Sequence, residues 1–288
     1  MSTARLLLTH LRLHFQLLLA PLFLWGAALA GGRLTPRLLL GFLAFHVFLY
    51  GGTTAFNSAY DRDEGPVGGL YQPPPAPLAL LPFSLVVQAI GALLAALVSP
   101  AALAVYLAMA LLGAAYSHPA TRWKASPATA LPTIAFGQGV LGFLAGFATA
   151  SPAPNTPALV VVVGAVSAAL VVSGFYPLSS LFQLEEDRQR GDRTIGVAWG
   201  APAAFAVALG CFLLALPLLV GLAWSRFGPL DALALALGMA VVILGTLRWR
   251  RRFVATAVRQ NFLAAMRLNA LAAACFSAYL VWRLLSPG

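Results

Sequence analysis

Acidic residues are scarce in this chain, which has eight Asp and Glu residues against eighteen Lys and Arg in a total of 288. Charged residues make up 9% of the sequence, hydrophobic residues make up 60%, and the mean hydropathy is +0.86. A water-soluble fold cannot bury so large an apolar share, so the composition predicts a protein whose solvent is a lipid bilayer. The net charge of +10 fits anionic lipid headgroups and requires no nucleic-acid partner.

Cysteine is also scarce, with two residues, Cys211 and Cys275, in separate apolar runs. Neither has a second cysteine or a histidine nearby in the sequence, which excludes a disulfide framework and a zinc site of the usual spacing. Lysine is represented by Lys124 alone, so this residue is a candidate for a specific role.

Long apolar runs are abundant. A membrane-spanning helix needs roughly 20 mainly apolar residues to cross about 30 Å of hydrocarbon. Nine runs meet this requirement: 15–32, 37–56, 78–98, 101–117, 131–150, 157–181, 201–223, 230–247 and 262–284. They are too long for the strands of a transmembrane barrel. We therefore expect an all-α polytopic membrane bundle of about nine transmembrane helices, forming a single integral-membrane domain over residues 1–288.

The basic residues fall unequally on the two sides of these nine spans. One side carries thirteen of them: Arg5, Arg12, Arg62, Arg122, Lys124, Arg188, Arg190, Arg193, Arg248, Arg250, Arg251, Arg252 and Arg259. The other side carries Arg33, Arg37, Arg226 and Arg283. Short cytoplasmic loops carry the excess of Lys and Arg. The amino terminus and the loops after the second, fourth, sixth and eighth spans are therefore expected in the cytoplasm.

Seven of the eight acidic residues lie in two short stretches, 61–64 and 185–192, which we call the first and second acidic segments. Each is expected at the cytoplasmic end of a helix, after the second and the sixth span. The carbonyl groups at a helix C-terminus already carry partial negative charge, so carboxylates placed there need a compensating cation.

The two segments share a sequence frame, seen by aligning "NSAYDRDEG" with "QLEEDRQRG". In both, a carboxamide stands four residues before an Asp-Arg pair: Asn57 before Asp61, and Gln183 before Asp187. Residues four apart lie on one face of a helix. Oxygen donors without His or Cys suit Mg²⁺, which is commonly completed by substrate phosphates. The alternative interpretation is that these acids are solvated loop charges paired with nearby arginines.

A third segment, "YSHPATRWKASP" at residues 116–127, follows the fourth span. With these three motifs in this order, the chain resembles the UbiA superfamily of intramembrane prenyltransferases. The resemblance implies a helical bundle around a central cavity. It also implies Mg²⁺-dependent transfer of a prenyl group from an isoprenoid diphosphate to an aromatic or other lipophilic acceptor in the membrane, in quinone, haem or related synthesis. The expected location is the bacterial inner membrane, with the active-site loops cytoplasmic.

The resemblance also implies roles for individual residues. The expected catalytic residues are Asp61, Asp187, Arg122 and Lys124. The expected metal-binding residues are Asn57, Asp61, Glu64, Asp187 and Asp192. The expected substrate-binding residues are Asn57, Tyr116, Ser117, Arg122, Lys124, Gln138 and Arg193.

Some positions depart from the family pattern. Ser58 and Gly65 stand where the first motif usually has acids, and Gln183 stands where the second motif usually begins with Asp. A relative that uses the diphosphate differently, such as a terpene cyclase or a phosphoribosyl-transferring lipid enzyme, therefore remains an alternative. A secondary transporter is a third hypothesis, although transporters place ionisable groups near the bilayer midplane rather than at helix ends.

Aromatic rings can shield an allylic cation, and four stand on the fifth and sixth spans: Phe136, Phe143, Phe147 and Tyr176. Packing against neighbouring helices explains such residues equally well. Gln138 is a polar residue between glycines in an apolar run, so it could bind an acceptor hydroxyl or a neighbouring helix.

Overall fold

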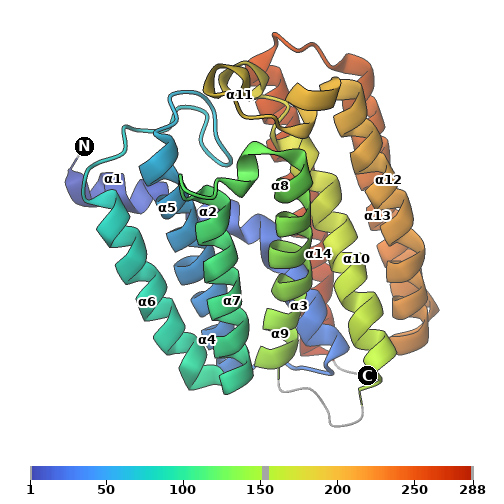
Figure 1. The fold of residues 1–288 in the computed structure, drawn as a ribbon. Coiled ribbons are helices and arrows are strands. Elements are labelled where there is room, and N and C mark those ends of the chain that lie inside the picture. The colour runs from blue at the N-terminus through green and yellow to red at the C-terminus, as the bar shows by residue number, and fades with distance from the viewer. Residues whose placement is uncertain (1, 151–155, 287–288) are drawn as a thin grey trace.

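The structure is a computed structural model, and it describes residues 2–150 and 156–286. In these residues nine helical stretches are long and apolar enough to cross a membrane, and they stand side by side in one bundle (Figure 1). The principal α-helices are α1 (Thr3–His10), α2 (Leu13–Gln16), α3 (Ala20–Leu29), α4 (Pro36–Leu43), α5 (Gly51–Asp61), α6 (Leu80–Val98), α7 (Pro100–Ser117), α8 (Pro127–Ile134), α9 (Leu141–Thr149), α10 (Ala158–Ser179), α11 (Leu184–Arg190), α12 (Ile195–Arg226), α13 (Pro229–Arg252) and α14 (Val258–Leu285). The expected all-α membrane bundle is confirmed.

Helix starts follow the local chemistry of the sequence. Thr35 precedes α4, and its hydroxyl accepts a hydrogen bond from the Leu38 amide at 3.2 Å. Ser99 caps α7 in the same way, through the Ala102 amide at 3.0 Å. Each cap is followed by a proline, which fits the first helical turn because the amide it lacks would have no partner there. These signals place the starts of α4 and α7 one residue from the expected ones, 37 and 101.

The amino-terminal span is broken. Arg12 adopts a left-handed backbone conformation with φ of 47°, and α1 ends just before it. As a result α1 lies across the end of the bundle, while α2 and α3 turn into it (Figure 1). The apolar pattern predicted only the run from residue 15, so α1 and this break are new.

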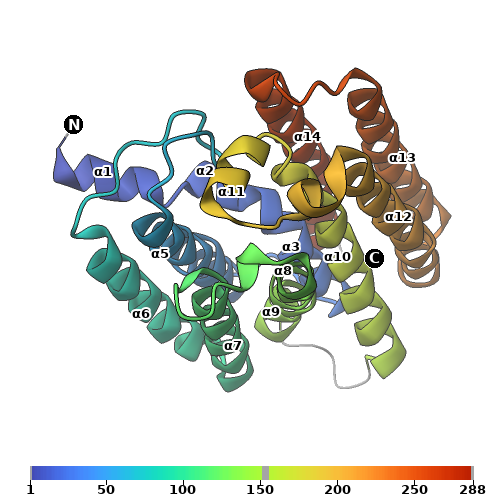
Figure 2. The same ribbon diagram turned by 45° about the horizontal axis from the view of Figure 1, so that its top comes forward.

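The second acidic segment does not end the sixth spanning helix, contrary to expectation. Helix α10 ends at Ser179, and the segment forms the separate helix α11, which lies across the end of the bundle (Figure 2). Its first turn contains Glu185, Glu186 and Asp187. The helix N-terminus carries partial positive charge, so these acids lie at the favourable end of their helix. The expected electrostatic conflict therefore applies only to the first segment, at the end of α5.

Close backbone packing holds the bundle together beside the cavity described below. A Cβ atom on Gly26 of α3 would lie 1.9 Å from the Phe143 carbonyl oxygen, and one on Gly146 of α9 would lie 1.8 Å from the Phe23 carbonyl oxygen. Only glycine allows this approach, which is a common way to pack helices in membranes. The contact fixes α3 against α9 in the middle of the bundle.

Candidate active site

A cavity of about 400 Å³ runs through the bundle, and its two ends differ in chemistry. At the end that α11 covers, which we call the α11 end, polar side chains from four elements line it, among them Asp61, Ser117, Lys124 and Asp187. Further in, the wall is formed mainly by apolar side chains of α3, α10, α12, α13 and α14. The cavity therefore joins a charged mouth to an apolar interior.

Asp61, the last residue of α5, lies at the centre of this mouth. Its side chain is 7% exposed, and its carboxylate pairs with the Lys124 ammonium and with the Arg122 guanidinium, 3.6 Å away. Its Oδ1 atom is buried and accepts no hydrogen bond from the described residues. The carboxylate is thus paired with two cations, while its Oδ1 atom lacks a hydrogen bond.

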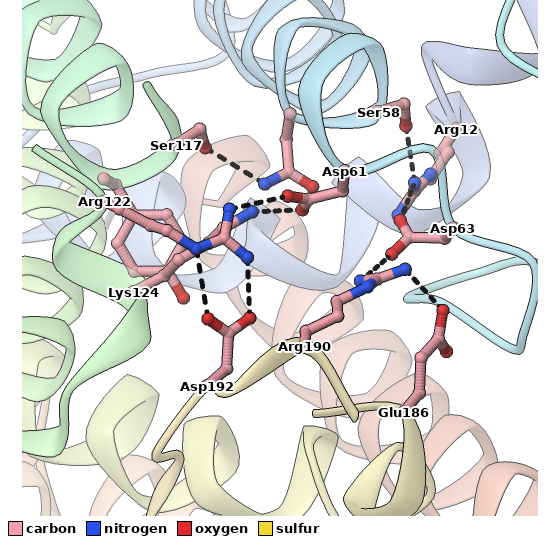
Figure 3. A network of polar contacts seen from close by, with 12 residues as sticks. Arg12, Ser58, Asp61, Asp63, Ser117, Arg122, Lys124, Glu186, Arg190 and Asp192 are labelled. Atoms are coloured by element: carbon pink, nitrogen blue, oxygen red, sulfur yellow. Dashed lines mark hydrogen bonds and ion pairs between the residues drawn. The ribbon is translucent and has the colours of Figure 1, made fainter. Parts of the chain in front are cut away.

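Arg122 joins the two acidic segments. Its Nε and Nη2 atoms donate to the two carboxylate oxygens of Asp192, at 3.1 and 2.9 Å, while its Nη1 faces Asp61 (Figure 3). The chain around it is fixed, because the Arg193 amide donates to the Ala125 carbonyl at 2.8 Å. This backbone hydrogen bond connects the segment that follows α11 to the loop that carries Arg122.

Asp187 completes the charged mouth from the side of α11. It is buried, and the Thr194 hydroxyl donates to its Oδ2 at 3.0 Å. Burial raises the pKa of Asp187 to about 7, an effect that the Thr194 hydrogen bond opposes. On the other side, Asn57 donates from Nδ2 to the Ser117 hydroxyl at 3.0 Å.

The pKa values of the two basic residues beside Asp61, Lys124 and Arg122, shift in opposite directions. Burial lowers the pKa of Lys124, although the neighbouring Asp61 carboxylate acts against that shift. For Arg122 burial also lowers the pKa, but the hydrogen bonds and charge of Asp192 outweigh it and the net shift is upward. Both side chains lie beside Asp61 and compensate the carboxylates at the end of α5.

Most of the expected site residues meet in this cavity. Its lining includes Asn57, Asp61, Tyr116, Ser117, Lys124, Gln138, Asp187 and Asp192. Arg122 lies at the rim and contacts two of these carboxylates. Glu64 and Arg193 are exposed and do not line the cavity, so the geometry does not place them with the other proposed ligands.

Of the four aromatic candidates, Tyr176 lines the cavity, and its hydroxyl accepts a hydrogen bond from the Tyr116 hydroxyl at 3.4 Å. Phe136 is 52% exposed on the outside of the bundle, and Phe143 is buried in the core. Gln138 stands in a stretch of π-helix, Ala135–Val140, between α8 and α9. Such insertions re-aim side chains and are frequent at functional sites.

Two further residues of the mouth, Arg12 and Arg190, carry no distinctive sequence signal for a place in the site. Arg12 and Arg190 line the cavity, and Asp63 lies between them (Figure 3). Arg62 and Arg188, the arginines of the shared Asp-Arg frame, are both exposed. The break at Arg12 and the position of α11 bring the other arginines to the site, and neither feature follows from hydropathy.

The donor chemistry fits a magnesium ion. In the described residues no three His, Cys, Asp or Glu side chains converge as a complete metal cage. Mg²⁺ does not need one, because it commonly takes one or two carboxylates and completes its shell with water and substrate phosphates. Asp61, Asp187 and Asn57 all line the cavity, and the Oδ1 atom of Asp61 accepts no hydrogen bond from the described residues, so oxygen donors for the ion are present.

The fold and site define an integral membrane helix bundle with a charged cavity mouth. The chain belongs to the UbiA prenyltransferase family, whose model matches residues 19–271.

Individual relatives agree with this assignment. The protoheme IX farnesyltransferase of Aeropyrum pernix is 29% identical over 171 residues, and the match spans 58% of this chain and about half, 54%, of that relative. The apo structure of a UbiA homologue from Aeropyrum pernix has a TM-score of 0.68 at 22% identity and covers 91% of this chain and 96% of its own. A UbiA homologue from Archaeoglobus fulgidus, in a structure with DMAPP and Mg²⁺, has a TM-score of 0.66 at 20% identity. The match covers 93% of this chain and 99% of that homologue. These structures share the fold.

Proposed function

We propose that this protein is a Mg²⁺-dependent prenyltransferase, which moves a prenyl group from an isoprenoid diphosphate to an aromatic or other lipophilic acceptor in the membrane. The observation that carries the proposal is the two-ended cavity, whose mouth holds buried carboxylates and cations and whose interior is apolar. A prenyl diphosphate has the matching division into a charged head and a hydrocarbon tail. The related proteins of known structure or activity support the same chemistry.

Mg²⁺ would be held by Asp61 and Asp187, with Asn57 and Asp192 beside them. When bound, it would neutralise charge that grows on the diphosphate as the carbon–oxygen bond breaks. Lys124 and Arg122 would donate to the departing oxygens, because both already lie beside Asp61 and would exchange that partner for the diphosphate. The Tyr116 and Tyr176 rings, near the mouth, would shield the allylic cation from water.

The acceptor would approach from the membrane side of the cavity. Gln138 lines the cavity, and no hydrogen bond from its side chain is seen among the described residues. We assign it to a polar group of the acceptor. We also place the α11 end in the cytoplasm, because the loops at that end carry most of the basic residues. That orientation would present the mouth to water-soluble prenyl diphosphates.

The test uses purified protein in lipid nanodiscs, prenyl diphosphates of several lengths, and a panel of aromatic and lipophilic acceptors. We expect a prenylated product, identified by mass, that forms with Mg²⁺ and does not form after chelation by EDTA. Release of diphosphate with a cyclised hydrocarbon and no use of acceptor would instead indicate a terpene cyclase. Transport of an ion or solute across proteoliposomes without product would indicate a transporter.

A further inference from the structure

Arg190 forms a second bridge between the two acidic segments, apart from the one made by Arg122. Its Nη1 atom donates to Asp63 of the first segment, and its Nη2 atom donates to Glu186 of the second (Figure 3). Glu186 lies one helical turn before Arg190 on α11, so the guanidinium forms a fork that reaches from that helix to the loop after α5. The two segments are therefore joined without a metal ion.

The Asp63 end of the bridge is buried, whereas the Arg190 and Glu186 side chains are partly exposed. The Asp63 side chain is 5% exposed, and its second carboxylate oxygen lies 3.8 Å from the guanidinium of Arg12. Arg12 in turn donates to the Ser58 hydroxyl of α5 at 2.7 Å. Asp63 is thus held between two arginines from distant parts of the chain, which fixes the loop that follows Asp61.

Gly65 leaves space for the other end of this bridge. A Cβ atom at position 65 would lie 2.5 Å from Oε2 of Glu186, so a larger residue would push the Glu186 carboxylate away. Glu186 does not line the cavity, whereas Arg190 does. Glu186 consequently acts on the site through Arg190 and through the position of α11.

We propose that Arg190 is a positioning residue: by joining Asp63 to Glu186 it fixes α11 over the cavity mouth and holds Asp61 and Asp187 at the separation in which they bind a divalent cation. This rests on the proposed function, which places the cation at those two carboxylates. Asp61 precedes Asp63 by two residues, and Asp187 follows Glu186 directly, so the bridge lies next to both proposed ligands along the chain.

The direction in which cation affinity changes when Arg190 is replaced distinguishes a positioning role from a simple effect of charge. If Arg190 were only a nearby positive charge, its removal would make the mouth more negative and would strengthen cation binding. If it positions the ligands, its removal weakens binding, since loss of a residue that orients metal ligands typically costs 10- to 100-fold in affinity. The two explanations predict opposite changes.

The experiment measures Mn²⁺ binding by electron paramagnetic resonance, with inorganic pyrophosphate present, for the full-length protein in nanodiscs. We expect Arg190→Gln to weaken binding by at least about tenfold. The matched control is Arg188→Gln, which removes the same charge from the same helix. The Arg188 side chain is 57% exposed, and its ion pair among the described residues is with Glu185, 3.6 Å away. It should change binding by less than about twofold. Equal or tighter binding in Arg190→Gln would overturn the proposal.

A second variant covers the case in which Arg190→Gln does not fold. Arg190→Lys keeps the charge but cannot form the two-pronged fork, because an ammonium is a single point of donation. We expect weaker Mn²⁺ binding here too, with an unchanged elution volume on size exclusion. Wild-type affinity in Arg190→Lys would show that charge alone is sufficient, and the positioning role would be wrong.

A metal-free measurement distinguishes failure of this proposal from failure of the proposed function. Spin labels would be placed at the exposed positions 64 and 189 by Glu64→Cys and Gln189→Cys, with Cys211 and Cys275 replaced by alanine. Without metal, the distance distribution should be narrow in the otherwise unchanged chain and should broaden on Arg190→Gln. If it does not broaden, the bridge does not position α11. If it broadens but no variant, including wild type, binds Mn²⁺, the bridge is supported and the assignment of the cation site is wrong.

Discussion

Two buried carboxylates at opposite ends of the bundle differ in whether they line the cavity. Asp231, near the start of α13, accepts a hydrogen bond from the Tyr279 hydroxyl at 2.7 Å and lies 3.8 Å from Nε of Arg283. Arg283 also stacks over the ring of Phe227, 4.6 Å from its centre. Asp231 does not line the cavity. Its contacts join α13 to α14 and so stabilise the packing of these two helices.

Asp61, at the α11 end, is buried to a similar degree and pairs with two cations, but it lines the cavity, and its Oδ1 atom accepts no hydrogen bond from the described residues. Burial of an acid alone therefore does not indicate function in this protein. A buried carboxylate oxygen without a hydrogen bond carries a desolvation cost that a ligand in the cavity would offset. The following predictions test that distinction.

The largest effect is expected for Asp61→Asn, which keeps the shape of the side chain and removes its charge. We expect prenyl transfer to fall about 100- to 1,000-fold in kcat, because Asp61 would hold the Mg²⁺ ion that stabilises the leaving diphosphate. Product formation measured by mass spectrometry checks this. Asp231→Asn is the control for removing a buried acid, and it should leave kcat within about twofold. A similar loss in both variants would contradict the comparison.

A smaller effect is expected for Lys124→Gln. Charge-assisted hydrogen bonds are worth roughly 1.5–3 kcal/mol, so kcat/KM for the prenyl diphosphate should fall about 10- to 100-fold. Initial rates over a range of diphosphate concentrations would measure this. Arg283→Gln removes a cation paired with the acid at the other end, and it should leave kcat/KM unchanged. Unaltered kinetics in Lys124→Gln would mean that this lysine only neutralises Asp61.

The third prediction concerns pH. The pKa of Asp187 is raised to about 7 by burial, so below pH 7 the folded protein keeps a proton on this carboxylate, and a metal ion must displace it. The Mg²⁺ concentration for half-maximal activity should therefore rise as the pH falls below about 7, by up to about tenfold per pH unit. Titrations of Mg²⁺ at pH 6, 7 and 8 would test this. A constant Mg²⁺ requirement over that range would exclude Asp187 as a ligand.

The same pKa shift has a consequence for stability. An unfolded Asp ionises near pH 3.8, so between about pH 4 and 7 the folded state binds more protons than the unfolded state. The contribution of Asp187 to stability is thus greatest at low pH and is lost as the pH rises through about 7, in the absence of metal. Added Mg²⁺ should restore thermal stability above pH 7 more than below it.

The smallest effect is expected for Tyr279→Phe, which removes the hydrogen bond to Asp231. We expect a loss of about 1 kcal/mol in stability, in the range measured for hydrogen bonds in membrane proteins, and no change in kcat. Thermal melting in detergent, together with the activity assay, would measure both. A marked loss of activity without loss of stability would show that the Asp231 cluster also contributes to function.

Much of the fold followed from the sequence. Spanning helices need long apolar runs, and helix starts need capping groups and tolerate proline, so the nine spans could be read from hydropathy and from residues such as Thr35 and Ser99. The helical spacing of Asn57 and Asp61 is also local, and both residues line the cavity. The second acidic segment was placed at the wrong element, because hydropathy does not show that α10 ends at Ser179 and that α11 begins anew.

The arginines of the mouth could not be assigned in the same way. Arg62 and Arg188 stand in the shared Asp-Arg frame, but both are exposed, because the direction of a side chain depends on where a helix begins and how it lies on its neighbours. The left-handed turn at Arg12 and the orientation of α11 place Arg12 and Arg190 on Asp63 instead. Both are tertiary features, since the contacts that stabilise them come from residues about 50 and 127 positions away.

The sequence by itself determined that nine helical stretches of the described residues are long and apolar enough to cross a membrane, and that most of the acids gather in two segments. The reason is that solvent partitioning and helical periodicity depend only on neighbouring residues. Only the tertiary structure decided which charges meet: Asp61 with Lys124 and Arg122, Asp63 with Arg12 and Arg190, and Asp231 with Tyr279 at the far end. The physical reason is that ion pairs act over a few ångströms between side chains remote in sequence. Their partners are fixed by the packing of helices, not by the order of residues along the chain.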